Sequence, residues 1–286
     1  MRLRRPQLLE PDALSPARSR LRDRGHLGLR GLFPRSEIAQ LRSQLEQLTA
    51  PVALMPSPGM DQDVGAYGAG WSFREQLWRR SPWLESWLLE GPPAIWIQRL
   101  LDRYDIWLLR DQAYFKHPGG EPTPWHQDGT FIPVDGLRSL TLWIPLTAVD
   151  AAASPMHYLD GSQRSCALQV GGGLSFETGL QEQTSEAAAH AVAVYDRLAP
   201  GDCLMHDTWT LHGSPSHRAP HPRLAYVVVY GYGDGSLADQ HALNGCGPLL
   251  RDQAALLRGS NQRSCFPELT TGDPVPGLST PYLRVV

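Results

Sequence analysis

The stretch DIWLLRDQAYFK, residues 105–116, contains the change of periodicity that decides the fold. Before it, apolar residues recur at the 3.6-residue spacing of helices, and from Asp105 onward they alternate at the spacing of two that is typical of strands. Strands are predicted on this basis at 106–116, 139–149, 202–206 and 223–230. Because helices come first and strands follow, we expect a β-sandwich or barrel with helices packed against it.

The segment N-terminal to this point is predicted to hold a short strand and three helices. The strand lies within 25–33 and the helices within 36–48, 82–88 and 93–101, with Ser36 and Ser81 as predicted caps. Loops are predicted at 51–70, at 162–200 as an insertion between strands, and beyond 231 apart from a helical piece near 252–257. We expect one domain spanning residues 1–286.

Composition excludes several classes of protein. The chain has 286 residues, 42% hydrophobic residues and a net charge of −3, with its basic residues scattered, so nucleic acid is not expected as a partner. No apolar stretch is long enough for a secretion signal or a membrane span. Cysteines at 166, 203, 246 and 265 form no CxxC pair, which favours reduced thiols in a cytoplasmic protein. A monomer or homodimer is expected.

Three residues suggest a metal site. His126 and Asp128 stand two apart in TPWHQDGT, residues 123–130, and His212 follows far downstream in LHGS. Side chains at i and i+2 of an extended segment project the same way, so the first two can share one ion while the third arrives from another strand. Two imidazoles and one carboxylate form a facial triad, which leaves positions open for a co-substrate and dioxygen.

Arg223 stands 11 residues beyond His212 and makes the prediction of a metal site more specific than the three candidate ligands alone do. The planar guanidinium of an arginine matches the two oxygens of a carboxylate. We therefore expect 2-oxoglutarate to chelate the metal, with its distal carboxylate held by Arg223 and the hydroxyl of Ser214.

The chain resembles the phytanoyl-CoA dioxygenase-like family of iron(II)- and 2-oxoglutarate-dependent oxygenases over about residues 20–235. The motifs that carry the resemblance are GHLGLRGLF at 25–33, WHQD at 125–128, LTLWIPL at 140–146, LDGS at 159–162, and HGS at 212–214 with the trailing arginine. Two positions depart from the family pattern: Gln163 stands where a histidine is common, and Pro215-Ser216-His217 stands where an asparagine is usual. Residues 236–286 form a C-terminal extension.

The resemblance implies a double-stranded β-helix, a cupin-like jelly roll, buttressed by the N-terminal helices. It implies that His126, Asp128 and His212 bind iron, that Arg223 and Ser214 bind the distal carboxylate, and that Trp143 lines the co-substrate pocket. The implied reaction is hydroxylation of a C–H bond of a small metabolite or acyl substrate by dioxygen, with release of succinate and carbon dioxide. Related halogenases lack the carboxylate ligand, so Asp128 favours hydroxylation, although desaturation, epoxidation and ring closure use the same triad.

Alternation adds pocket candidates. Thr141 and Trp143 share one face of the segment 139–149, and Leu140, Leu142, Ile144 and Leu146 share the other. Alternation along 106–116 places four polar residues on one face of that strand, where they are candidates for contacts to co-substrate or substrate: Arg110, Gln112, Tyr114 and Lys116.

The same triad is also compatible with other functions. A non-catalytic cupin-like metal-binding protein and a metal-dependent hydrolase would use the same triad, although neither needs Arg223. His206, His217 and His221 compete with His212 but lack the spacing of helical zinc sites.

Further residues are candidates for shaping the substrate pocket. Those near the triad in the sequence are Trp125, Gln127, Phe131 and Arg138. The segment 51–80 is a candidate lid whose arginines, Arg74, Arg79 and Arg80, suit an anionic substrate, and it also carries Trp71.

Overall fold

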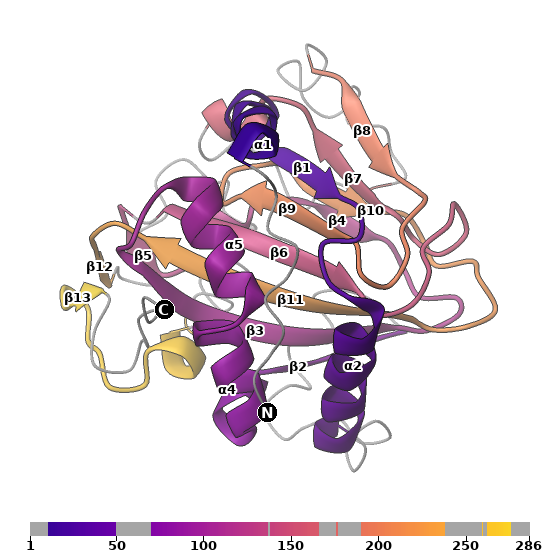
Figure 1. The fold of residues 1–286 in the computed structure, drawn as a ribbon, viewed down its shortest axis with the longest axis horizontal. Helices are drawn as coiled ribbons and strands as arrows, with labels where there is room; N and C mark the ends of the chain where they lie inside the picture. Colours follow the sequence, from indigo (N-terminus) through magenta and orange to yellow (C-terminus); the bar gives the residue numbers. More distant parts are fainter. Residues whose placement is uncertain are drawn as a thin grey trace.

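The computed structural model describes residues 11–49, 70–136, 138–165, 176, 190–237, 259 and 262–275. Figure 1 shows helices on one side of a broad sheet and a second, smaller sheet beyond it. The labelled helices are α1 (Pro11–Arg24), α2 (Arg35–Thr49), α4 (Pro82–Leu89) and α5 (Pro92–Leu101), with short 3-10 turns η1 (Leu77–Arg80), η2 (Asp128–Thr130) and η3 (Ser162–Arg164). Residues 262–265 form a further helical turn.

The larger sheet has six strands in the order β1-β9-β6-β11-β3-β2, and all neighbours are antiparallel. Its strands are β1 (His26–Leu29), β9 (Cys203–Asp207), β6 (Arg138–Pro145), β11 (Arg223–Tyr232), β3 (Ile106–Lys116) and β2 (Trp71–Glu75). Strands far apart in the sequence thus lie side by side, as expected for a jelly roll.

The smaller sheet has the order β4-β10-β7-β8 and faces the larger one. Its strands are β4 (Thr123–His126), β10 (His212–Ser214), β7 (Met156–Leu159) and β8 (Val192–Tyr195). A third set, β13 (Pro274–Val275), β12 (Gly235–Leu237) and β5 (Val134–Asp135), packs at one end. The predicted double-stranded β-helix with flanking helices is confirmed.

The helices cover the outer face of the larger sheet. Leu41 of α2, Trp87 of α4 and Ile97 of α5 are fully buried and belong to one apolar cluster with Leu142 and Val228 of the sheet. Ser81 caps α4 by accepting a hydrogen bond from the backbone N–H of Leu84, as its sequence predicts. Because the helices protect one face, the opposite face of the sheet is left to form the interior.

A bulge in the larger sheet determines which side chains of β3 point inward. Val229 of β11 pairs with Arg110, but the next residue, Tyr230, pairs with Leu108, so Leu109 is the extra residue. A bulge changes the alternation of the strand that carries it. Arg110, Gln112 and Tyr114, beyond the bulge, share the inner face by ordinary alternation, whereas Ile106 and Leu108, before it, lie in the apolar cluster beneath the helices.

Three predictions about local structure are wrong. Residues 71–75 of the candidate lid form the edge strand β2, because their side chains pack beside β3; residues 51–69 lie outside the described residues. Part of the expected insertion, 192–195, is strand β8, and the expected loop beyond 231 contains β12 and β13. The helix α1 was not expected, since its sequence is polar and contains Pro16. The helical piece predicted near 252–257 lies outside the described residues.

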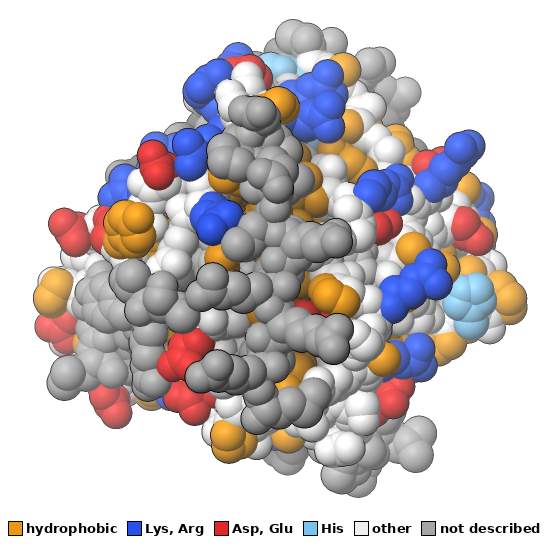
Figure 2. Space-filling model, viewed as in Figure 1, with side chains coloured by type: hydrophobic (Ala, Val, Ile, Leu, Met, Phe, Trp, Pro, Cys, Tyr) orange, Lys and Arg blue, Asp and Glu red, His pale blue; other side chains and the backbone are white. Residues whose placement is uncertain are grey.

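Two surface features bear on the sequence expectations. On the face in Figure 2, the described basic side chains are spread among acidic ones rather than gathered in one patch. Within the described ranges, no helix has the length and apolar character needed to cross a membrane. Cys203 and Cys265 are buried free thiols; the other two cysteines fall outside those ranges.

Asp111 predicts a pH-dependent contribution to stability. It is fully buried under the helices, and burial raises the pKa of its carboxyl to about 7, even though Tyr226 Oη and the backbone N–H of Trp78 donate to Oδ2. Between about pH 4 and pH 7 the folded protein therefore holds a proton that the unfolded chain releases, so this contribution falls as the pH rises through that window.

We expect Asp111→Asn to remove this contribution, because the amide stays neutral while its oxygen accepts the same two hydrogen bonds. Urea unfolding at pH 5 and pH 8 should show a smaller loss of stability in the variant than in the wild type. Equal losses in both proteins would show that Asp111 is ionised throughout.

Candidate metal centre

The pairing of β10 with β4 brings the two histidines of the candidate triad together. His212 is the cross-strand partner of His126, and their ring centroids lie 4.2 Å apart. Directly opposed residues on neighbouring strands have their side chains close enough to share a ligand. Gly213 permits this approach, because a Cβ there would lie 2.9 Å from the backbone oxygen of Thr123.

Asp128 joins the histidines from the first residue of η2. One of its oxygens, Oδ1, lies 3.7 Å from His126 Nε2 and 3.8 Å from His212 Nε2. Gly129 leaves room for the side chain of Trp209, because a Cβ would lie 2.8 Å from the indole. One ligand atom from each of the three side chains lies within 4.8 Å of the others, which is compatible with one bound metal ion.

Both histidines present Nε2 to this point. His126 Nδ1 donates to the carbonyl of Pro124 at 2.8 Å, and His212 Nδ1 donates to the carbonyl of Thr210 at 2.9 Å. Such contacts fix the ring and the tautomer, as is common for metal-binding histidines. Burial, and then the proximity of other histidines, lowers the pKa of each ring to about 4. Neutral imidazoles are the form that binds metals.

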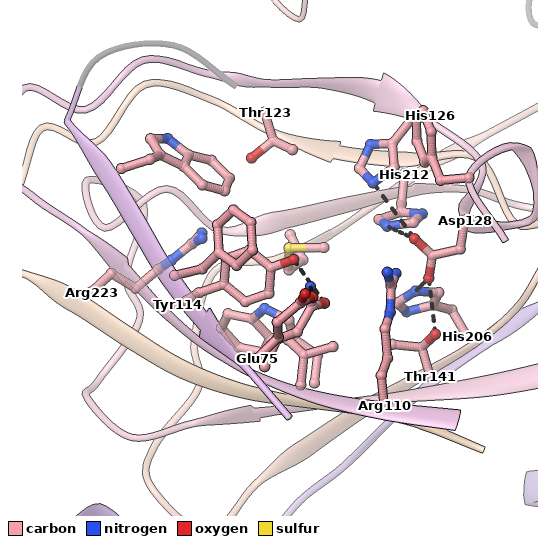
Figure 3. Close-up of a pocket in the computed structure, with 17 residues that line it drawn as sticks. Glu75, Arg110, Tyr114, Thr123, His126, Asp128, Thr141, His206, His212 and Arg223 are labelled. Atoms are coloured by element: carbon pink, nitrogen blue, oxygen red, sulfur yellow. Dashed lines mark hydrogen bonds and ion pairs between the residues drawn. The ribbon is translucent and has the colours of Figure 1, made fainter. Parts of the chain in front are cut away.

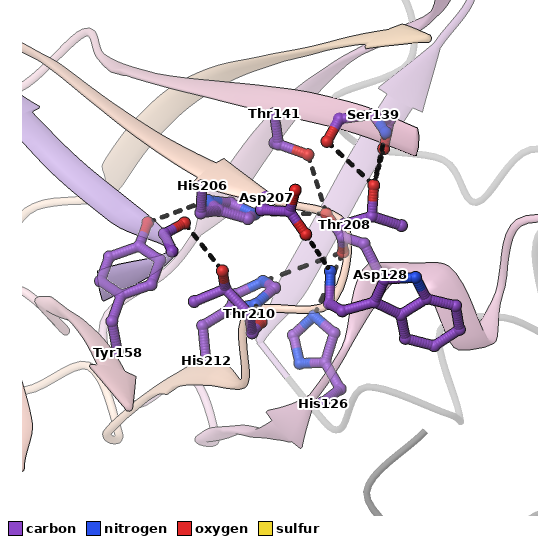
Figure 4. A network of polar contacts seen from close by, with 12 residues as sticks. His126, Asp128, Ser139, Thr141, Tyr158, His206, Asp207, Thr208, Thr210 and His212 are labelled. Carbon is purple, nitrogen blue, oxygen red and sulfur yellow. Dashed lines mark hydrogen bonds and ion pairs between the residues drawn. The ribbon is translucent and has the colours of Figure 1, made fainter. Parts of the chain in front are cut away.

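The second oxygen of Asp128 is held by the protein. Thr141 Oγ1 donates to Oδ2 at 2.9 Å, and His206 Nε2 donates to the same oxygen at 3.2 Å (Figure 4). His206 is itself oriented by the hydroxyl of Tyr158, at 3.2 Å from Nδ1. Burial acts to raise the pKa of Asp128, but the hydrogen bond from His206 and the three nearby histidines hold it well below its usual value. The carboxylate is therefore ionised, with Oδ1 free to bind a metal.

One cavity extends from these three residues to Arg223 (Figure 3). Its wall comes from both sheets and from the edge strand β2, and it contains most of the residues predicted from alternation. The lining residues are Trp71, Phe73, Glu75, Arg110, Gln112, Tyr114, Thr123, His126, Asp128, Phe131, Thr141, Trp143, Met156, His206, His212, Arg223 and Val227.

Arg223 lies at the end of the cavity away from the candidate ligands (Figure 3). Its side chain is 3% exposed, its Nη1 donates to the carbonyl of Ser154, and its guanidinium lies 5.4 Å from the Trp143 ring. No described carboxylate lies within 4.0 Å of it, and Nε has no partner among the described residues. Burial lowers its pKa to about 10, so it remains charged and lacks a counterion.

A chain of hydrogen bonds crosses the cavity between its two ends. Tyr114 Oη donates to Gln112 Oε1 at 3.0 Å, and Gln112 Nε2 donates to Glu75 Oε2 at 3.3 Å. Glu75 comes from β2, so this edge strand contributes an acidic group that sequence analysis placed in no role.

Several predicted pocket residues do not line the cavity. Trp125 stacks on Phe176, and Gln127 Nε2 donates to the carbonyls of Ser165 and Trp209 instead. Arg138 is exposed, with its side chain over Tyr232. Residue 127 faces away because i and i+1 of an extended segment point in opposite directions.

The remaining predicted residues divide between the cavity and its surroundings. Phe131 and Trp71 line it, whereas the Arg79 guanidinium lies over the Trp78 ring. Ser214 and Lys116 are fully buried beside the cavity wall. The competing His217 donates to the carbonyl of His221, away from the triad.

Five lining residues were not predicted. One of them, Val227, lies on the predicted strand 223–230, for which no inner face was assigned. Phe73 and Glu75 lie on a strand that was read as a lid, although their alternation with Trp71 was a usable signal. Thr123 and Met156 lie on strands of four residues, which are too short to show a period.

Fold and site together define a jelly-roll protein with two histidines and one carboxylate placed as a candidate metal centre. The chain belongs to the phytanoyl-CoA dioxygenase family, whose pattern matches residues 21–225. No curated protein sequence matches the chain significantly.

Solved structures with the same fold share about a fifth of their residues with this chain. The carbocyclase SnoK of nogalamycin biosynthesis, described as non-haem and α-ketoglutarate-dependent, is 20% identical with a TM-score of 0.72, covering 97% of this chain and 98% of its own. The epimerase SnoN of the same biosynthesis is 19% identical with a TM-score of 0.72, covering 96% and 100%. EvdO2 from Micromonospora carbonacea var. aurantiaca, complexed with 2-oxoglutarate, is 21% identical with a TM-score of 0.61, covering 86% and 98%.

We expect Thr141→Val to weaken metal binding about tenfold, because residues that orient a ligating carboxylate typically contribute ten- to hundredfold to affinity. Valine keeps the shape of threonine but cannot donate to Asp128 Oδ2. Anaerobic titration with iron(II), or with manganese(II) followed by electron paramagnetic resonance, measures the affinity.

Thr141→Ser is the matched control, since it retains the hydroxyl and should bind metal nearly as the wild type does. Equal affinity of the valine and serine variants would show that the hydrogen bond does not orient the carboxylate.

Proposed function

We propose that this protein is an iron(II)- and 2-oxoglutarate-dependent dioxygenase that hydroxylates a C–H bond of a small molecule and releases succinate and carbon dioxide. His126, Asp128 and His212 would hold iron(II). The observation that carries the proposal is the buried, uncompensated Arg223 at the opposite end of the cavity that contains this triad. A ligand that chelates a metal at one end and carries a carboxylate at the other would bind the metal at the triad and supply the counterion of Arg223.

The donor set fits iron(II). Two neutral imidazoles and one carboxylate oxygen bind on one side of the ion and leave open positions, which is typical of non-haem iron oxygenases. When bound, iron(II) with 2-oxoglutarate supplies oxidative decarboxylation coupled to attack on a C–H bond.

The protein's own residues do the positioning. Arg223 pairs with the distal carboxylate, and the indole of Trp143 lies beneath its guanidinium. Thr141 orients Asp128, while Gln112 and Tyr114 form a polar wall between the two ends. Apolar and aromatic groups, including Phe73, Met156 and Val227, exclude water from the rest of the cavity.

Hydroxylation is proposed over halogenation because Asp128 occupies the carboxylate position that a halide would need. The structures of similar fold are titled a carbocyclase and an epimerase, so ring closure and epimerisation are the competing outcomes. A metal-dependent hydrolase or an inert scaffold has no use for a buried arginine facing the metal site.

The first test is binding. Iron(II) and 2-oxoglutarate added without oxygen should give the weak visible charge-transfer band of the chelate, and a metal chelator should abolish it. We expect Arg223→Leu to weaken 2-oxoglutarate binding at least tenfold, since a hydrogen bond to a charged group contributes roughly 1.5–3 kcal/mol. Arg42→Leu, the same change at an exposed arginine on α2, should have no effect.

The second test is turnover. A panel of small molecules should contain one that stimulates succinate release in air, and mass spectrometry of its product distinguishes a gain of oxygen from ring closure or epimerisation. Absence of both the band and succinate would show that the protein is not an oxygenase of this class.

A further inference from the structure

Lys116 is the only lysine in the chain, since the other 25 of its 26 basic residues are arginines. It is the last residue of β3 and is fully buried between Trp71 of β2 and Arg223 of β11, its two cross-strand partners. Nζ lies 4.6 Å from the centroid of the Trp71 ring. Lysine differs from arginine in presenting all its donors from one compact atom whose charge shifts readily on burial.

The surroundings of Lys116 lack negative charge. No described carboxylate lies within 4.0 Å of Lys116 or of Arg223, so two basic side chains are buried side by side without an acidic group among the described residues. Burial and the charge of Arg223 lower the pKa of Lys116 to about 6. His217, in the turn after β10, is the other titratable group that interacts with it through space.

The three contacts of Nζ are all with neutral oxygens that can accept. They are Ser154 Oγ at 2.8 Å, the carbonyl of Pro215 at 3.0 Å and Ser214 Oγ at 3.3 Å. An ammonium group has three hydrogens and no lone pair, so it must donate to all three. Ser214 is thereby fixed as an acceptor toward Lys116.

The ammonium form of Lys116 also determines to which oxygens the neighbouring hydroxyl groups donate their hydrogens. Ser154 has one hydrogen, and its shortest contact is the carbonyl of Pro215. Ser214 Oγ lies 2.7 Å from Thr123 Oγ1 and 3.1 Å from Ser154 Oγ. Either oxygen of the shorter pair can be the donor, and because that contact is the shorter one, the Ser214 hydrogen is assigned to Thr123. Thr123 then has its hydrogen free, and it lines the cavity at the end where Arg223 lies (Figure 3).

We propose that Lys116 is a positioning residue for the co-substrate: as an ammonium ion it orients the Ser214 and Thr123 hydroxyls so that Thr123 donates its hydrogen to the distal carboxylate. The inference rests on the proposed function, because the distal carboxylate is that of 2-oxoglutarate. Lys116 touches neither the metal nor the ligand and acts through two hydroxyl groups.

A second consequence is proton uptake. Without ligand, Lys116 is largely an uncharged amine above its lowered pKa. A dicarboxylate at Arg223 supplies the missing negative charge and favours the ammonium form, so co-substrate binding at neutral pH takes up a proton onto Nζ.

The test is a double-mutant cycle on 2-oxoglutarate affinity, read from the charge-transfer band of the anaerobic iron(II) protein. Lys116→Met keeps the length of the side chain without a donor, and Thr123→Val keeps the shape of threonine without a hydroxyl. We expect each to weaken binding about tenfold, and the double variant to bind within about twofold of the weaker single variant, because both act through one hydrogen bond. Thr123→Ser should bind as the wild type does.

A keto acid without a distal carboxylate, 2-oxobutyrate, separates this role from a structural one. It chelates the metal in the same way, so its affinity should be unchanged in all four variants. Calorimetry of 2-oxoglutarate binding in two buffers of different ionisation heat should show proton uptake in the wild type and none in Lys116→Met.

The inference is overturned if the effects of the two substitutions add, if 2-oxobutyrate binding falls equally, or if proton uptake persists in Lys116→Met. Should Lys116→Met fail to fold, equal 2-oxoglutarate affinity of Thr123→Val and Thr123→Ser overturns it independently. Absence of any band in the wild type contradicts the proposed function instead, so the two failures are distinguishable.

Discussion

The antiparallel pairing of β10 with β4 is the constraint on which the candidate site depends. It sets His212 opposite His126 and, through the turn after β4, brings Asp128 to the same point. Two further hydrogen bonds then occupy the second oxygen of the aspartate. A pairing of only a few residues therefore determines the position of all three candidate ligands, and the larger sheet supplies the groups that orient them.

Charge is distributed unevenly along the cavity. The triad end carries an ionised aspartate among neutral histidines, whereas the other end carries the buried guanidinium of Arg223, the buried amino group of Lys116 and no acid among the described residues. Buried charges without partners are costly, and proteins retain them mainly where a ligand supplies the partner. We therefore expect the charge of Arg223 to be balanced in the complex with an anionic ligand and unbalanced in the free protein.

The extent to which the sequence predicts this structure depends on element length. The strand 106–116 was placed correctly because eleven residues show a clear period, and Thr141 and Trp143 followed from the same reasoning. The strands β4, β7, β8 and β10, of three or four residues each, were not predicted because they are too short to show a period, although β1 and β9, of four and five residues, were. The role of His206 could not be predicted, because its contact with Asp128 depends on the pairing of β9 with β6.

The edge position of β2 has a consequence for access to the interior. In the six-stranded sheet this strand has one hydrogen-bonded neighbour, β3, whereas β3 is paired on both sides. Strands held on one side open locally at a lower free-energy cost than those in the middle of a sheet. Because Trp71, Phe73 and Glu75 line the cavity, local opening of this edge strand would expose one wall of the interior to solvent.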